Sequence, residues 1–363
     1  MSASEHVFAA AARLDARSIA CIQAARVGEL AIMNLNPLRF TALTFTLAAM
    51  IGCGDDSSDP GVDAPVGPVS IVATAQATPE LATLVAAVEF ASDNGDLVDL
   101  LSDPGTLTVF APTNAAFDAL AVELTGTPGA TGADLLTAAN KPLLRAVLQY
   151  HVLTSEVFAA AIPFGRPIAS AGGGIFKIDT GTPPIITDGR NRTSRITATD
   201  VDASNGVVHL IDRVILPADK NIVETAQALA AASPAEFTIL VDAVVAANLA
   251  GTLSGTGPFT VFAPTDAAFA ALLTELGITR QQLLADTALL TRVLTYHVVS
   301  GRVFKAEVPV GAPITTVETG TFTVDASLRI TDERSRTSGI VSTDVQASNG
   351  VIHVLDRVLL PAP

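Results

Sequence analysis

Two stretches of this sequence are near-copies of each other. Residues 205–217 read NGVVHLIDRVILP, and residues 349–361 read NGVIHVLDRVLLP. Upstream, TVFAPT occupies residues 108–113 and again residues 260–265, and Tyr-His pairs stand at residues 150–151 and 296–297. The copies are offset by 144, 152 and 146 residues respectively, which is the length of a domain and too long for a solenoid unit. The chain therefore contains a duplicated domain, which we place at residues 70–217 and 220–361.

Each copy begins with a helical pattern. In the first copy, Thr78-Pro79 precedes apolar residues at positions 81, 84, 85 and 88, the spacing of one helix face. In the second, Ser233-Pro234 with Glu236 has the form of a capping box before a stripe at positions 237, 240, 241 and 244. We therefore predict a helix with one buried face at each place.

The remaining elements follow in the same order in both copies. TVFAPT is a short β-branched and aromatic run that is ended by its proline, which predicts a strand, and Thr113 or Thr265 is positioned to cap the next helix. A third helix is predicted with His151 or His297 on its apolar stripe. Short segments with glycine and proline turns then predict strands, the last of which opens with Asn-Gly. Helices followed by strands within one unit indicate the α+β class.

These boxes, in this order and twice over, resemble the fasciclin domain, of the fasciclin I type. The resemblance covers nearly all of residues 70–361. It implies two tandem domains, each a compact wedge of β-sheet with packed helices. It also implies a role in cell adhesion or extracellular matrix contact, with a protein, carbohydrate or lipid partner that differs among members. The fold alone does not name the ligand.

The composition excludes several classes of protein. The chain has 363 residues with 36 acidic and 21 basic side chains, a formal charge of −15, which argues against nucleic acid as a partner. The mean hydropathy of +0.47 is high, yet the longest apolar run, Phe40 to Gly52, is shorter than the roughly 20 residues of a membrane span. The two cysteines are too few for a disulfide framework or a four-thiolate zinc site.

The N-terminal region has the layout of an export signal. Residues 35–53 read LNPLRFTALTFTLAAMIGC, in which Arg39 precedes an apolar run and Gly52 precedes Cys53. This resembles a bacterial lipoprotein signal at residues 33–52, which implies that Cys53 becomes the lipidated N-terminus. Residues 1–32 would then be an upstream leader assigned in error, with Met33 as the true start. An ordinary buried thiol at Cys53 behind a genuine long leader is the alternative.

Residues 53–69 contain an acidic segment rich in proline and glycine, GDDSSDPGVDAPVGPV. Such a segment has too little apolar surface to fold and is expected to act as a tether. Residue 54, directly after the cysteine, is glycine and not aspartate. By resemblance to Gram-negative lipoproteins, this favours sorting to the outer membrane. We therefore expect an exported protein that contacts the membrane through a lipid anchor only, at the outer membrane or cell surface, with a periplasm-facing orientation as the alternative.

The histidines and tyrosines are the first candidates for functional residues. Apart from His6, the histidines occur only at matched positions of the two copies, and each tyrosine precedes one of them. The set comprises Tyr150, His151, His209, Tyr296, His297 and His353. A metal pair would need further ligands at suitable spacing, which are missing, so we interpret these residues as structural hydrogen-bonding groups. By resemblance to fasciclin domains, the Tyr-His region is linked to adhesion, and we expect it to act through the integrity of the fold.

Two loops are candidate ligand sites. The basic loop GRNRTSR holds Arg190, Arg192 and Arg195, and its copy ERSRTS holds Arg334 and Arg336. It could bind an acidic polysaccharide or carboxylates, although such clusters usually face water at a hairpin tip. The segment DVDASNG at residues 200–206 resembles a calcium loop, but its glycine is one position late and the twelfth residue is Ile211. We interpret it as a turn.

No motif for catalysis is present. The sequence contains no G-x-S-x-G elbow, P-loop, dinucleotide fingerprint or H-E-x-x-H zinc motif. We therefore predict a non-enzymatic protein without a cofactor or metal, which binds extracellular protein or polysaccharide. A binder of a small lipophilic ligand in a fasciclin-domain pocket is the alternative, and a hydrolase with an undetected site would need polar side chains converging in a cleft.

Overall fold

The structure is a computed structural model that describes residues 68–363. The predicted signal at residues 33–52, the lipidation site Cys53 and nearly all of the tether lie outside the described residues.

The first domain has a helical half followed by a strand-rich half. The helical half contains α2 (Ile71–Gln76), η2 (Pro79–Leu81), α3 (Ala82–Ala91), α4 (Asp96–Ser102), α5 (Asn114–Thr125), η3 (Gly132–Leu135) and α6 (Lys141–Tyr150) around β1 (Leu107–Pro112). The second half contains β2 (Val152–Leu153), η4 (Ala159–Ala161), β3 (Pro167–Ala169), β4 (Ile175–Asp179), β5 (Ile185–Thr187), β6 (Thr193–Ala203) and β7 (Gly206–Ile211). The order of helices and strands is the predicted one.

The second domain repeats this order. Its helices and the strand between them are α7 (Ile222–Ala230), α8 (Thr238–Ala246), α9 (Ala250–Leu253), β8 (Phe259–Pro264), α10 (Asp266–Leu276), α11 (Arg280–Ala285) and α12 (Thr287–Tyr296). The strands and the short helix that follow are β9 (Val298–Ser300), η5 (Lys305–Glu307), β10 (Pro313–Thr315), β11 (Thr321–Val324), β12 (Arg329–Thr331), β13 (Thr337–Ala347) and β14 (Gly350–Leu355). The predicted α+β class with two tandem domains is confirmed.

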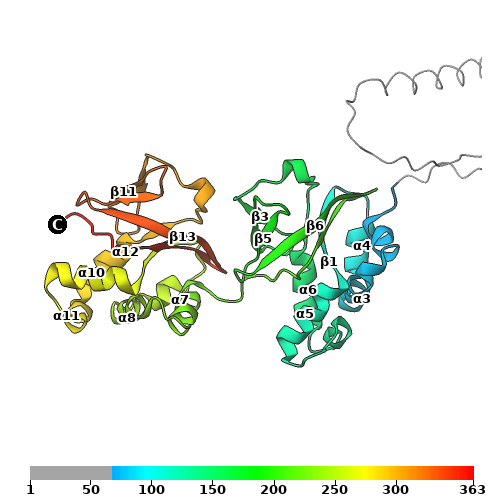
Figure 1. Ribbon diagram of the computed structural model, residues 1–363, viewed down its shortest axis with the longest axis horizontal. Helices are drawn as coiled ribbons and strands as arrows, with labels where there is room; N and C mark the ends of the chain where they lie inside the picture. The colour runs from blue at the N-terminus through cyan, green and yellow to red at the C-terminus, as the bar shows by residue number, and fades with distance from the viewer. Residues whose placement is uncertain (1–67) are drawn as a thin grey trace, which may run out of the picture. The chain divides into compact units, whose positions relative to one another are not determined.

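Each domain is built on one seven-stranded sheet. The strand order is β2-β1-β7-β6-β5-β4-β3 in the first domain and β10-β11-β12-β13-β14-β8-β9 in the second. The strand TVFAPT pairs in parallel with the closing strand of its own domain, and the other strand pairs are antiparallel. Figure 1 shows the helices of each domain gathered on one side of its strands. The two most similar boxes of the sequence therefore lie side by side within each sheet.

Strand β1 separates two apolar cores. Because side chains alternate along a strand, Val109 and Ala111 point to a core shared with the helices, while Phe110 points to a core among the strands. In that second core, the Phe110 ring meets the ring of Phe176 edge to face, with centroids 5.3 Å apart. All six residues of β1 are buried, which explains why TVFAPT reads as a continuous apolar run.

The Asn-Gly pair before the closing strand has a structural reason in both domains. A Cβ atom on Gly206 would stand 2.0 Å from the Leu107 carbonyl oxygen, and its φ of +149° also favours glycine. The buried Asn205 accepts a hydrogen bond from the Ile71 N–H and donates to the carbonyls of Leu101 and Asp103. Asn349 makes the matching contacts in the second domain. This pair therefore joins the start of α2 or α7 to the sheet.

The helix caps agree with the sequence at some positions and differ at others. Thr113 and Thr265 accept hydrogen bonds from the N–H groups of Ala116 and Ala268, which confirms both as caps. Thr78 precedes a short 3-10 helix and makes no capping hydrogen bond.

The predicted capping box at Ser233 and Glu236 is wrong. Helix α8 begins at Thr238, and its cap is Phe237, which has a left-handed backbone with φ of +67° and a buried ring. The Asp266 carboxylate accepts hydrogen bonds from the N–H groups of Thr238 and Ile239 at the start of this helix. The start of the helix is thus fixed by a residue 28 positions away, which a local pattern cannot reveal.

Candidate functional site

The two tyrosines join the third helix of each domain to the strands. Tyr150 donates a hydrogen bond from its hydroxyl to the Ile175 carbonyl at 2.5 Å and accepts one from the Gly189 N–H at 2.9 Å. Tyr296 bonds in the same way to Thr321 and Glu333. Burial raises the pKa of both hydroxyls above their ordinary value, so both stay protonated at neutral pH. These tyrosines hold two parts of one domain together.

The histidine that follows each tyrosine is buried and hydrogen-bonded at both ring nitrogens. His151 Nδ1 lies 2.7 Å from the Val147 carbonyl oxygen, and Nε2 accepts from the Ile215 N–H at 3.1 Å. This arrangement assigns the proton to Nδ1. His297 has the same partners in its domain, Val293 and Leu359. Burial lowers the pKa of each ring to about 4, so both are neutral near pH 7.

The histidines of the closing strands have a similar environment. His209 Nε2 lies 2.9 Å from the Val157 carbonyl oxygen, Nδ1 accepts from the Asp200 N–H, and the ring packs on Phe110 with centroids 5.4 Å apart. His353 makes the equivalent contacts, and burial lowers its pKa. None of the four histidines is exposed, and each bonds backbone groups of its own domain.

Replacing Tyr150 by phenylalanine is expected to lower the free energy of unfolding of the first domain by about 1–3 kcal/mol. The change removes the donor to the Ile175 carbonyl and one of the two acceptors of the buried Gly189 N–H, which still donates to the Leu216 carbonyl. Tyr296→Phe is the matched variant and should cost a similar amount, because it removes the donor to the Thr321 carbonyl and the exposed Glu333 N–H can bond water instead. Urea unfolding followed by circular dichroism measures both values. No measurable loss in either domain would contradict this account.

The basic loops contain a buried aspartate that the sequence analysis did not single out. Asp188 Oδ1 accepts from the N–H groups of Arg190 and Arg192, each at 2.9 Å. Its Oδ2 accepts from Arg192 Nε, Arg192 Nη2 and the Leu216 N–H at 3.0, 2.8 and 2.9 Å. Asp332 occupies the same position in the second domain. The D-x-R-x-R pattern, present in both copies, is the signal that could have identified it.

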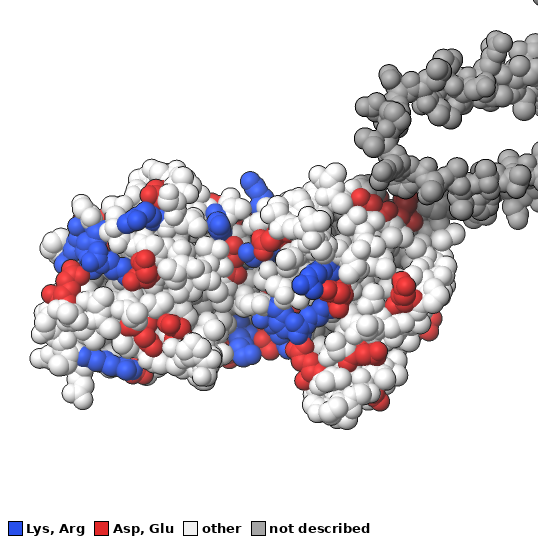
Figure 2. All heavy atoms as spheres, viewed as in Figure 1, with Lys and Arg blue, Asp and Glu red and all other residues white. Residues whose placement is uncertain are grey.

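The arginines of these loops are largely engaged within their own domains. Arg192 also bonds Glu123 and the Val214 carbonyl, and Arg336 bonds Glu275. Arg190 pairs with Asp219, and Arg334 donates to the Pro361 carbonyl. Arg195 is the most exposed of the paired arginines, with 66% of its side chain accessible. Figure 2 shows basic side chains interspersed with acidic ones on the face in view. A ligand would therefore meet a mixed surface.

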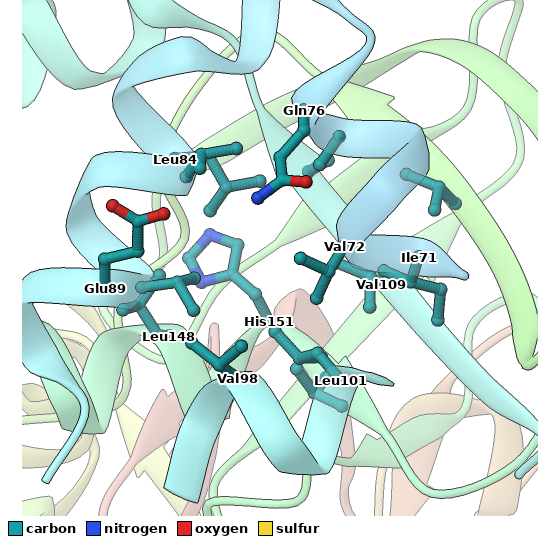
Figure 3. A pocket seen from close by; sticks show the side chains of 16 residues that line it. Ile71, Val72, Gln76, Leu84, Glu89, Val98, Leu101, Val109, Leu148 and His151 are labelled. Atoms are coloured by element: carbon teal, nitrogen blue, oxygen red, sulfur yellow. The ribbon is translucent and has the colours of Figure 1, made fainter. Parts of the chain in front are cut away.

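Each domain contains an apolar pocket between its helices and its sheet. In the first domain the pocket has a volume of about 100 Å³ and is lined by α2, α3, α4 and the strands, with His151 among its lining residues (Figure 3). The second domain has a pocket of about 40 Å³ at the equivalent place, with His297 in the matching position. The pockets are lined almost entirely by aliphatic side chains, and sequence analysis could not locate them because their walls come from distant segments.

Neither metal ligation nor membrane insertion finds support in the part of the chain that the structure describes. No group of three or more histidine, cysteine, aspartate or glutamate side chains within residues 68–363 is arranged to hold a metal ion. Over the same range, no helix combines the length and the apolar character needed to cross a bilayer. The polar side chains singled out from the sequence instead serve hydrogen bonding within each domain.

The repeated sheet, the buried Tyr-His pairs and the matched closing strands define a tandem α+β protein of one domain type. The Fasciclin domain family matches residues 79–217 and 235–361, and the chain belongs to this family. It is 30% identical over 262 residues to rabbit (Oryctolagus cuniculus) transforming growth factor-beta-induced protein ig-h3, covering 72% of this chain and 35% of that protein. The chain thus spans about a third of the length of this relative.

Two further comparisons concern single domains and the domain pair. Protein sll1483 of Synechocystis is 45% identical over 134 residues, which is 36% of this chain and 71% of that protein. A solved FAS1 domain pair from the insect cell adhesion molecule Fasciclin I matches with a TM-score of 0.37 and 18% identity, covering 77% of this chain and 97% of that one. The predicted resemblance to tandem fasciclin domains is confirmed by the family match.

Proposed function

We propose that this protein is an exported adhesion-type lipoprotein. Its two fasciclin domains would bind an extracellular protein or polysaccharide, and Cys53 would carry a lipid anchor at the outer membrane or cell surface. Family membership of both domains supports the adhesion role. The proposal that the protein is not an enzyme is supported by one observation. All four histidines of the two domains are buried and hydrogen-bonded within their own domain. These groups are engaged in the fold and are poorly placed to serve as catalytic bases.

The anchor is tested by Cys53→Ser. The change removes the thiol that would be acylated, so the protein should move from the membrane fraction to the soluble fraction, since no other segment is proposed to bind lipid. Fractionation of cells and detection of the chain by immunoblot measure the outcome. The matched control is Ser57→Ala in the tether, which should leave partitioning unchanged. Membrane association of Cys53→Ser equal to that of the unaltered chain would refute the anchor.

The adhesion role is tested by a binding screen of the full chain carrying Cys53→Ser against matrix proteins and acidic or neutral glycans. Arg195→Ala probes the exposed part of the basic loop.

Tyr150→Ala combined with His151→Ala probes the Tyr-His pair and is expected to lower the melting temperature of the first domain along with binding. Loss of binding at an unchanged melting temperature would instead make this pair a direct contact site. Binding to none of these probes would argue against the adhesion role.

A second candidate function is the binding of a small lipophilic ligand. The observation that favours it is the pair of apolar pockets at equivalent positions of the two domains. Such pockets, lined by aliphatic side chains, are the ordinary form of a small-molecule site. Mass spectrometry of an organic extract of the purified protein tests this candidate. A lipophilic compound present at a stoichiometric amount would support it.

A further inference from the structure

The mouth of the pocket differs between the two domains in one respect. In the first domain, Gln76 of α2 and Glu89 of α3 are among the lining residues, and both are exposed to solvent. Helix α8 carries Val245 at the position equivalent to Glu89, and this valine is 59% exposed. The lining of the second pocket includes no carboxylate or amide, whereas that of the first includes one of each. Figure 3 shows Gln76 and Glu89 on opposite sides of His151.

The interior of the first pocket offers no hydrogen bond to a ligand. Its only polar lining group besides the two at the mouth is the His151 ring, whose nitrogens are engaged by Val147 and Ile215. The rest of the lining consists of aliphatic side chains such as Leu84, Val88 and Val98. A ligand must therefore place an apolar body inside and any polar group at the mouth, because a buried unpaired polar group is costly.

Glu89 has no hydrogen bond or ion pair from any residue within the described range 68–363. Its carboxylate is therefore available to a group that enters the mouth. An ammonium group complements this charge, and the Gln76 carbonyl can accept a second hydrogen bond from it. The net charge of −15 also favours the approach of cations over anions.

We propose that the pocket of the first domain binds primary amines with a short alkyl or aryl body, with the ammonium group at Glu89. This proposal rests on the second candidate function and specifies its ligand class. The volume of about 100 Å³ is somewhat smaller than the roughly 150 Å³ of an apolar cavity that binds benzene, and the pocket is open at the mouth. A body of about four to six carbons fits this space.

The test compares two probes of equal length, n-hexylamine and 1-hexanol, on the full chain carrying Cys53→Ser. Methyl groups of Leu84, Val88 and Val98 report binding by NMR, and those lining the pocket of the second domain serve as an internal reference. Both probes should bind with roughly millimolar affinity, as expected for ligands of this size. The amine should bind about threefold more tightly than the alcohol, because an exposed ion pair contributes modestly.

Glu89→Val copies the second domain and should abolish the preference for the amine while the alcohol still binds. Glu80→Val removes an equal charge at an exposed site away from the pocket and should retain the preference. Ala75→Leu fills the pocket and should weaken the binding of both probes.

Equal affinity of amine and alcohol for the unaltered pocket would overturn the proposal but leave the second candidate function standing. Absence of methyl shifts with either probe would overturn both. Loss of the preference in Glu80→Val would attribute it to net charge and also overturn the proposal.

Discussion

Replacing Asp188 by alanine is expected to lower the free energy of unfolding of the first domain by about 3–5 kcal/mol. The carboxylate is 1% exposed and accepts five hydrogen bonds from Arg190, Arg192 and Leu216. Its removal leaves the buried Leu216 N–H without an acceptor. The Arg192 guanidinium, 14% exposed, would keep only the partly exposed Glu123 as an ionic partner. Breaking a buried pair by removing one partner is among the most damaging single changes in a protein.

Urea unfolding followed by circular dichroism measures the loss, and two variants calibrate it. Asp103→Ala removes an exposed carboxylate that accepts no hydrogen bond from the described residues, and it should change stability by less than about 0.5 kcal/mol. Asp332→Ala should destabilise the second domain by less than Asp188→Ala destabilises the first. The reason is that Asp332 accepts backbone N–H groups of Arg334, Arg336 and Leu360 but no guanidinium hydrogen bond. A loss at Asp188 no larger than at Asp103 would contradict the role assigned to this carboxylate.

The fold was predictable from the sequence because the repeated boxes coincide with adjacent strands of each sheet. TVFAPT and the Asn-Gly box form adjacent parallel strands in both domains, and the threonine after TVFAPT caps the next helix. These features depend on neighbouring residues, which local patterns represent well. The start of α8 was mispredicted because it depends on Asp266, a contact between distant segments.

The candidate site was predictable only in part. The Tyr-His pairs and the closing-strand histidines stood out because they recur at matched positions, and the structure gives the hydrogen bonds behind each. Asp188 was not predicted as a site residue, because in an acidic chain one more aspartate is less conspicuous than the arginines beside it. The apolar pocket has no sequence signal, since its walls come from α2, α3, α4 and three strands. The contrast of Glu89 with Val245 is visible when the two apolar stripes are aligned in sequence, but only the structure places these residues at a pocket.

Acidification from pH 6.5 toward pH 4 is expected to destabilise both domains through their buried histidines. Burial lowers the pKa of His151 and His297 to about 4, against an ordinary value of 6.5. Between these values the unfolded chain holds a proton on each ring that the folded domain does not, so unfolding takes up protons and stability falls as pH falls. The shift of 6.5 − 4 = 2.5 units corresponds to on the order of 3 kcal/mol for each histidine by pH 4.

The number of protons taken up on unfolding near pH 5.5 is the decisive measurement, because most carboxylates are still ionised there. The first domain should take up about one proton from His151, and the second should take up more than one, since burial also lowers the pKa of His353. Urea unfolding between pH 5 and pH 7.5 gives this number as the slope of the free energy of unfolding against pH.

His151→Gln should reduce the slope of the first domain by about one proton, even though it also lowers stability at every pH. An unchanged slope in that variant would show that His151 is not held neutral by burial. His297→Gln should leave the slope of the first domain unaltered, because its partners Val293 and Leu359 lie in the second.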